Sequence, residues 1–370
     1  MNGTLAVWYE PSEASFSEGA QPLKPKLEIH FNLWRDPPSR TDFLDIGLKL
    51  SDLDELCRFY VYFPVALSTE QISDLSKVMS FGQTLDAVFN TVVEKGLEND
   101  NYYIATCKGK PFVTVHNLTP STDLSVERVE DDAHHDGCIL TFSQNFCNRL
   151  KSGPQECQYI RLRIKLGREA RKIFTEEITA KDRLFVTLAD KLELTELRLN
   201  EQRSYPASIA KKAQAHTFDI SRVHYFLIRD LGHTLIAQHA PLRKVRRLEP
   251  SLWASYLKGE NVPAGNAGHL RKVASRLVIY HWREGDGTNP IEDFTAFATF
   301  RATSPGLLFY LLVIIALGAI GSTLSTMLVT KFGPGLSITI FTLALPGLWL
   351  INILKLACDK WVREYRGFRA

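Results

Sequence analysis

The sequence predicts an α+β protein with a β-rich cytosolic part, followed by a C-terminal transmembrane hairpin of two helices. Alternating apolar and polar residues, the pattern of half-buried strands, dominate the first three hundred positions. Amphipathic helical patterns interrupt them, and two uncharged segments follow at 306–330 and 335–354. We expect a β-rich α+β region at 1–150, an α+β region at 151–300 that can form one domain with the first, and a basic tail at 355–370.

The strand predictions depend on period-2 alternation. Over 27–33, Leu, Ile, Phe and Leu alternate with Glu, His and Asn, and the same pattern recurs at 44–50 and 160–166. The segment 59–63, Phe-Tyr-Val-Tyr-Phe, is apolar on both faces, as expected of an interior strand. A β-hairpin is predicted around Lys108-Gly109. Two further strands are predicted at 223–228 and 277–282.

The helix predictions depend on caps and on apolar residues three or four positions apart. Ser68 and Gln71 have capping-box spacing at the start of a helix predicted over 68–79. A second amphipathic pattern covers 85–92. The remaining segments are 207–215, which looks helical, and 183–199, which fits either a helix or a strand.

Composition excludes several classes of protein. The chain has 370 residues and a formal charge of +3, too little for a protein that mainly coats nucleic acid, so we expect no direct DNA binding. Six cysteines lack metal-ligand spacing, which predicts reduced thiols. The first ten residues lack the basic and apolar regions of a signal peptide. We therefore expect the β-rich part to stay in the cytosol.

The two uncharged segments have the length of membrane spans. A bilayer core needs about 20 apolar residues in a helix. Only the four residues 331–334 separate the segments, so the two helices must be antiparallel. Basic residues are concentrated in the tail after the second segment, and the turn carries only Lys331, which places the tail in the cytoplasm. The prediction is a multi-pass protein of the inner membrane with both termini cytoplasmic.

The predicted hairpin carries packing features besides hydrophobicity. Small residues at this spacing allow helix backbones to approach closely, either within one hairpin or between copies of the chain. They form two ridges on the first span, Gly318, Ser322 and Thr326 beside Gly321 and Ser325. The pair Pro346 and Gly347 is expected to kink the second span. The expected partners are the lipid bilayer and further copies of the chain.

One polar cluster is a candidate metal site. His134, His135 and Asp136 stand in the acidic segment 130–137, and imidazole and carboxylate groups together can bind a divalent ion. Adjacent loop residues rarely converge on one ion, so a solvated acidic loop is the alternative interpretation. Five histidines between 224 and 281 match no zinc motif.

A second cluster is a candidate anion site. Arg161, Arg163 and Lys165 alternate along one predicted strand, so their side chains share a face and could bind phosphate groups of a nucleotide or of anionic lipid. The alternative is an ordinary solvent-exposed strand face. The basic run 243–247 is either a contact to lipid headgroups or a solvated loop.

The sequence contains no phosphate-binding glycine loop and no nucleophile motif, and it predicts no cofactor. A cytosolic domain followed by a membrane hairpin resembles the architecture of membrane-anchored effectors in bacterial antiphage systems. That resemblance implies a non-enzymatic sensor, whose cytosolic domain binds a nucleotide, another ligand or a protein partner and whose hairpins then oligomerise and perturb the membrane. The alternatives are a membrane-tethered metal-dependent hydrolase and an inner-membrane adaptor that recruits a partner.

Overall fold

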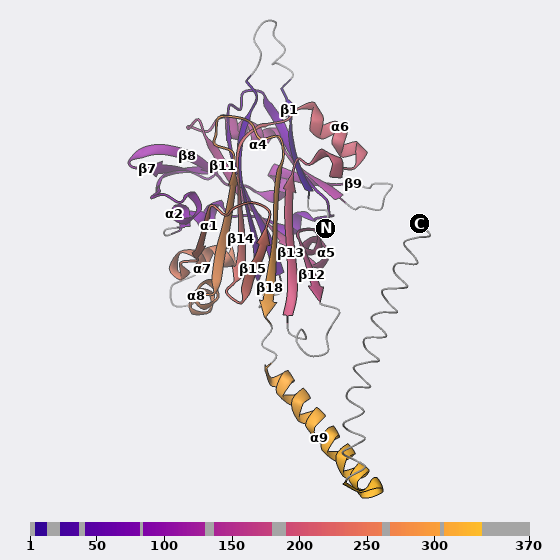
Figure 1. Ribbon diagram of the computed structural model, residues 1–370. Helices are drawn as coiled ribbons and strands as arrows, with labels where there is room; N and C mark the ends of the chain where they lie inside the picture. Colours follow the sequence, from indigo (N-terminus) through magenta and orange to yellow (C-terminus); the bar gives the residue numbers. More distant parts are fainter. Residues whose placement is uncertain are drawn as a thin grey trace. The chain divides into compact units, whose positions relative to one another are not determined.

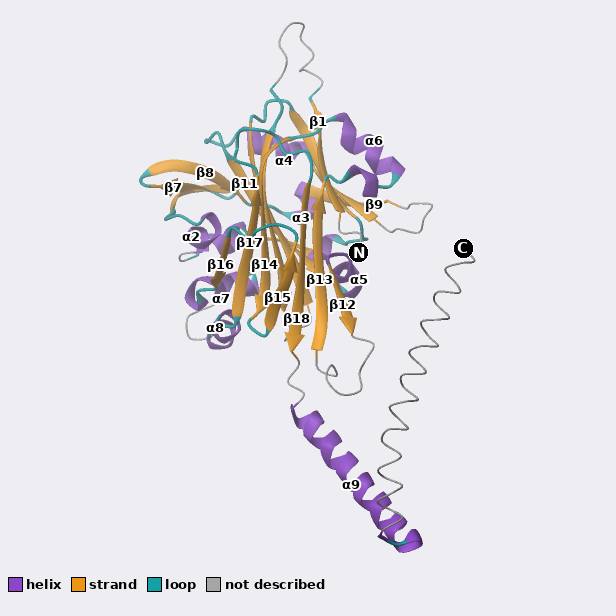
Figure 2. Cartoon of the chain, in the orientation of Figure 1, coloured by secondary structure: helices purple, strands orange, loops and turns teal. Residues whose placement is uncertain are grey.

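A computed structural model of the chain divides into two compact units, Met1–Thr303 and Ser304–Ala370. The residues that the structure describes are 4–12, 23–36, 41–81, 84–129, 137–179, 190–260, 267–303 and 307–334. The first unit is the β-rich α+β part that the sequence predicts, and strands dominate it (Figure 2).

The first unit contains two mixed β-sheets, and each sheet takes strands from both halves of the sequence. The eight-stranded sheet has the order β15 (His233–Gln238), β18 (Phe294–Thr303), β13 (Asp190–Leu199), β1 (Thr4–Pro11), β4 (Leu56–Phe63), β10 (Gly137–Phe142), β9 (Leu124–Val129), with β12 (Thr175–Thr179) paired to β13. The ten-stranded sheet has the order β16 (Lys244–Arg247), β17 (Leu277–Glu284), β14 (Asp219–Asp230), β2 (Lys26–Asp36), β3 (Thr41–Ser51), β11 (Gln158–Leu166), β8 (Lys110–His116), β7 (Tyr102–Cys107), β6 (Glu94–Glu98), with β5 (Ile72–Asp74) paired to β11.

The main hydrophobic core lies between the two sheets. The apolar half of each predicted alternation points into it: Ile29 and Phe31 of β2 belong to the same core as Val7 of β1 and Phe59 of β4. Because side chains alternate across a strand, the polar half of the same pattern lies on the outer face. The alternation therefore identified both the strands and the face that each buries.

Helices cover part of the outer face of the ten-stranded sheet and form a second core there (Figure 1). Trp34 of β2 packs against Trp253 and Tyr256 of one of these helices, α7. This helix ends at Gly259, whose φ of 80° is the left-handed conformation that glycine adopts without strain. The covering helices are α1 (Ser76–Met79), α2 (Thr84–Phe89), α7 (Pro250–Lys258) and α8 (Gly268–Ala274).

One helix prediction needs correction, and one ambiguous segment is resolved as a strand. The segment 68–79 is not one helix: it contains a capped 3₁₀ turn, η2 (Thr69–Gln71), then β5, then α1. Pairing of β5 with β11 satisfies backbone groups that a continuous helix would have used internally. The ambiguous segment 183–199 contains β13, which pairs with β18 along its whole length. The helix predicted at 207–215 is confirmed as α6.

The remaining helices flank the sandwich. Ile209 and Ala213 of α6 pack on the outer face of the eight-stranded sheet, against Ala6 and Trp8 of β1. Ser143 caps α4 by accepting a hydrogen bond from the backbone N–H of Phe146. These elements are α3 (Pro120–Asp123), α4 (Gln144–Lys151), α5 (Arg168–Phe174), η3 (Gln202–Ser204) and α6 (Ala207–Ala215).

In the part of the second unit that the structure describes, residues 307–334, the chain forms the long apolar helix α9 (Leu307–Phe332). Its segment Leu311–Phe332 is long and apolar enough to cross a membrane. The predicted small-residue ridges, Gly318, Gly321, Ser322, Ser325 and Thr326, all lie on α9. The predicted second span at 335–354, with Pro346 and Gly347, and the tail at 355–370 lie outside the described residues.

Candidate functional site

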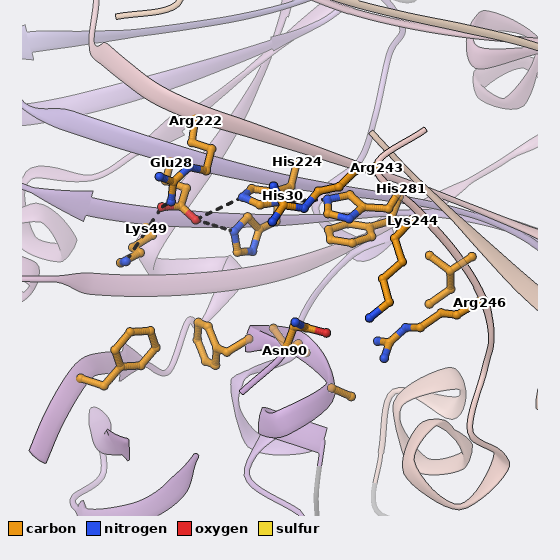
Figure 3. Close-up of a pocket in the computed structure, with 16 residues that line it drawn as sticks. Glu28, His30, Lys49, Asn90, Arg222, His224, Arg243, Lys244, Arg246 and His281 are labelled. Carbon is orange, nitrogen blue, oxygen red and sulfur yellow. Dashed lines mark hydrogen bonds and ion pairs between the residues drawn. The ribbon is translucent and has the colours of Figure 1, made fainter. Parts of the chain in front are cut away.

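A cavity of about 460 Å³ lies on the outer face of the ten-stranded sheet, beside the helices that cover the rest of that face. Strands β2, β3, β14 and β17 form one wall, and β16 contributes basic side chains to the rim (Figure 3). Helix α2 and the adjoining Asn90, together with Phe112 of β8, form the opposite wall.

Strand register brings the polar residues of this wall together. In the antiparallel pair β2–β3, Glu28 lies opposite Lys49. In the parallel pair β2–β14, Arg222 pairs with Glu28 and His224 pairs with His30. All these residues lie on the polar half of the strand alternation, so their side chains leave the sheet on the cavity side.

Glu28 is the centre of the cluster. Its Oε1 atom lies 3.1 Å from Nε2 of His30 and 3.5 Å from Nε2 of His224. Its Oε2 atom lies 3.5 Å from Nη1 of Arg222 and 3.9 Å from Nζ of Lys49. Each carboxylate oxygen therefore faces a different pair of groups, histidines on one side and permanent cations on the other.

Burial lowers the pKa of two histidines that line the cavity. Burial lowers the pKa of His30 to about 4, against the opposing effect of Glu28. Burial, with repulsion from His224 and Arg243, lowers the pKa of His281 to about 3. Burial alone would raise the pKa of Glu28, but the hydrogen bonds from the histidines outweigh it and the pKa is lowered. At neutral pH, Glu28 is therefore ionised, and His30 and His281 are neutral.

Positive charge exceeds negative charge in the cavity. Among the described residues that line it, five side chains are permanent cations, whereas Glu28 carries the one carboxylate. Their crowding affects a neighbour: burial, then repulsion from Arg243 and Arg222, lowers the pKa of Arg283. The five lining cations are Lys49, Arg222, Arg243, Lys244 and Arg246.

Aromatic rings supply the apolar part of the lining. The ring of Phe226 stacks on that of His281, with centroids 4.2 Å apart. Phe112 lies under the ammonium of Lys49, 5.3 Å from ring centroid to Nζ. Phe89 of α2 completes this apolar lining. The cavity therefore offers flat apolar surfaces beside a cationic wall, a combination suited to a ligand with both a planar and an anionic part.

The structure places Arg161 and Arg163 on one face of β11, as the alternation predicts, but this face is not solvent-exposed. Their exposed fractions are 1% and 3%, because α7 covers them. Arg161 donates to the hydroxyls of Tyr256 and Tyr159, at 2.6 and 2.8 Å. The solvent-face alternative is therefore wrong for both arginines.

Arg163 is held by the protein as well. It donates to both oxygens of Asp45, at 2.7 and 3.1 Å, and to the carbonyl of Leu257 at 2.9 Å. Lys165, the third predicted residue, is exposed. Anion binding by these three residues stays a prediction, and the two arginines already have partners within the chain.

Sequence reasoning did not find the Glu28 cluster. Two sequence features could have indicated it. Glu28 and His30 are polar members of the alternation at 27–33, and the basic run 243–247 supplies three lining residues. His224 is far away in the sequence, and only the parallel pairing of β14 with β2 brings it to them. The predicted metal residues His134, His135 and Asp136 lie outside the described residues.

Comparison with known proteins does not supply a function. No protein-family model and no curated protein matches the chain. Two structures of yeast LTA4 hydrolase are distantly similar. The complex with bestatin is 7% identical, with a TM-score of 0.25 over 77% of this chain and 31% of the enzyme. The native enzyme is 9% identical, with a TM-score of 0.23 over 74% and 29%. The chain thus spans under a third of these proteins, and the likeness carries no argument about fold or activity.

Proposed function

We propose that the chain is a membrane-anchored, non-enzymatic sensor whose β-sandwich binds an anionic small molecule in the Glu28 cavity. The observation that carries this proposal is the cationic excess: five cations against one carboxylate among the described lining residues. Several like charges on one wall repel one another, and such an arrangement is stabilised when an anion binds. The ligand is then part of the charge balance of the site.

The chemistry of the cavity favours a phosphate-bearing ligand with a planar group. Arginine and lysine are the side chains that proteins use most for phosphate. Figure 3 shows Lys244 and Arg246 extending from the sheet toward the side on which Asn90 and helix α2 lie. Phe226 and Phe112 provide surfaces on which a ring can stack. A nucleotide-like molecule satisfies both requirements.

The membrane part of the proposal concerns how binding is transmitted. Helix α9 is a candidate span, and its small residues suit close contact between helices. We propose that α9 and the segment 335–354 form a hairpin with both ends cytoplasmic, that ligand binding promotes its oligomerisation, and that the oligomer perturbs the inner membrane. By architectural analogy with membrane-anchored effectors, this would be a role in bacterial antiphage defence.

Calorimetry with inorganic pyrophosphate tests ligand binding by the full-length protein in detergent. Arg246 and Arg247 are adjacent on β16, but only Arg246 lines the cavity. We expect Arg246→Ala to weaken pyrophosphate binding by about 10-fold or more, and Arg247→Ala, the matched control, to leave it unchanged. Absence of binding to the wild type, or equal losses in both variants, would refute the cavity as an anion site.

Vesicle assays test the membrane part separately. A sensor of this kind should shift from a small to a larger oligomer when the ligand is added, and should release dye from vesicles only in that state. A protein that stays monomeric in detergent with and without ligand, and never permeabilises vesicles, would contradict an effector function while leaving ligand binding standing.

A further inference from the structure

We propose that Glu28, His30 and His224 bind one divalent transition-metal ion of the zinc class. The ligand atoms of these three side chains all lie within 4.8 Å of one another. The two histidines each direct Nε2 at the same oxygen, Oε1 of Glu28, at 3.1 and 3.5 Å. Three ligand atoms therefore converge on one point at the wall of an open cavity.

The two separations between Glu28 and the histidines match those of a metal coordination shell. Zinc binds histidine nitrogen and carboxylate oxygen at about 2.0–2.2 Å, so neighbouring ligands of a tetrahedral ion are roughly 3.3 Å apart. The ligands also come from rigid elements, because His30 and His224 are paired residues of adjacent strands. A site built on two central strands needs little rearrangement to bind an ion.

Each histidine has a second partner that fixes its ring. The Nδ1 atom of His224 lies 3.0 Å from Nε2 of His281, and Nδ1 of His30 lies 3.4 Å from the hydroxyl of Tyr159. Arg161 in turn donates to that hydroxyl at 2.8 Å. Metal-binding histidines typically direct one nitrogen at the ion and hydrogen-bond the other, which is the arrangement seen here.

The donor set selects the class of metal. Two imidazoles and one carboxylate suit zinc and neighbouring transition metals better than calcium or magnesium, which prefer oxygen ligands. Lys49 and Arg222 hold Oε2 of Glu28, so Oε1 stays directed at the histidines. Three protein ligands also leave a coordination position for an anion. The suggestion that an anion takes this position rests on the proposed function, whereas metal binding itself does not.

Cobalt titration of the metal-stripped, full-length protein tests the site. We expect one Co²⁺ per chain, with visible absorption typical of tetrahedral or five-coordinate cobalt and displacement by Zn²⁺. Glu28→Gln and His224→Asn should weaken binding by more than about 100-fold, and His281→Asn, which removes a positioning residue, by about 10–100-fold. His269→Asn, an exposed histidine on α8, is the matched control and should bind as the wild type does.

X-ray absorption spectroscopy of the zinc-loaded wild type gives a readout that needs no variant. Two imidazole ligands and one carboxylate would support the site, and sulfur ligands would overturn it. No bound cobalt, or unchanged binding in Glu28→Gln and His224→Asn, would also overturn it. Loss of the metal only in a His134→Asn, His135→Asn variant would overturn it in favour of the loop at 130–137. Pyrophosphate binding by the metal-free protein tests the proposed function independently.

Discussion

Two polar clusters occupy the same outer face of the ten-stranded sheet and differ in how their charge is balanced. One, which we call the closed cluster, consists of Asp45, Arg161, Arg163 and Tyr256 beneath α7. The other, the open cluster, consists of Glu28 with its histidines and surrounding cations, and it faces the cavity. Both clusters lie on neighbouring strands of one sheet and both include a residue of β3, so the difference comes from what covers each.

The closed cluster has an internal partner for each oxygen of Asp45. The carboxylate accepts hydrogen bonds from Trp34 at 2.7 Å, from Tyr256 at 2.8 Å and from Arg163, and its exposed fraction is 0%. Burial would lower the pKa of Arg163, but Asp45 outweighs this effect and raises it, so the guanidinium of Arg163 stays charged. Such a cluster fixes the position of α7 and offers nothing to a ligand.

The comparison teaches that residue type alone does not mark a binding site. Arginines on a strand were the candidate from sequence, and burial beneath a helix assigned them to folding. An excess of one charge on an open wall is the more specific signal, because folding has not neutralised it. The predictions below separate the two clusters by stability on one side and binding on the other.

The largest expected effect is on the closed cluster. Asp45→Ala leaves the Arg163 guanidinium buried without its carboxylate, which should lower the free energy of unfolding by about 3–5 kcal/mol. Urea denaturation of the purified protein measures this. A loss below about 1 kcal/mol would mean that the pair is not the structural element described.

A second stability effect, at a buried histidine that belongs to neither cluster, should appear as a dependence on pH. His116 is fully buried, with Nε2 2.7 Å from Oε1 of Gln158, and burial lowers its pKa from 6.5 to about 4. Between these values the unfolded chain binds a proton that the folded chain does not, so stability falls as the pH falls. Relative to His116→Gln, the wild type should lose about 3 kcal/mol from pH 6.5 to pH 4. If the free energies of unfolding of the wild type and of His116→Gln change with pH in the same way, this prediction is wrong.

Removing one cation from the open cluster should alter binding without altering folding. Arg222→Ala takes away a charge 3.5 Å from Glu28 and should weaken pyrophosphate binding by about 10–100-fold. The free energy of unfolding should change by less than about 1 kcal/mol, since the site already has an excess of positive charge. A variant that unfolds readily but binds normally would reverse the assignment of the two clusters.

A stability effect of similar size is expected at the residue where the two clusters meet. Gly47 lies beneath the ring of Tyr159, and an added Cβ would come within 2.2 Å of its hydroxyl. Gly47→Ala must therefore displace Tyr159 from both Arg161 and His30, at a cost of about 1–3 kcal/mol. Thermal denaturation measures the cost, and an unchanged midpoint would show that the tyrosine moves freely.

Much of the sandwich could be predicted from the sequence, because alternation depends on local geometry alone. The strand at 27–33 and its buried face follow directly from that pattern. What covers the opposite face depends on tertiary packing, so the burial of Arg161 could not be foreseen. The same holds for the break of the helix at 68–79, where pairing with β11 overrides local preference. The open cluster needed the pairing of His30 with His224, which no local pattern encodes.

The most direct test of the two-cluster account is thermal or urea unfolding of each variant with and without saturating pyrophosphate. The wild type should gain about 2.7 kcal/mol at a ligand concentration of about 100 times Kd. At the same ligand concentration Arg222→Ala should keep the unliganded midpoint and gain only about 0.4–1.4 kcal/mol. Asp45→Ala should have a lowered midpoint and keep the full gain. If pyrophosphate stabilises no protein, or stabilises Arg222→Ala as much as the wild type, the assignment of the open cluster to ligand binding is contradicted.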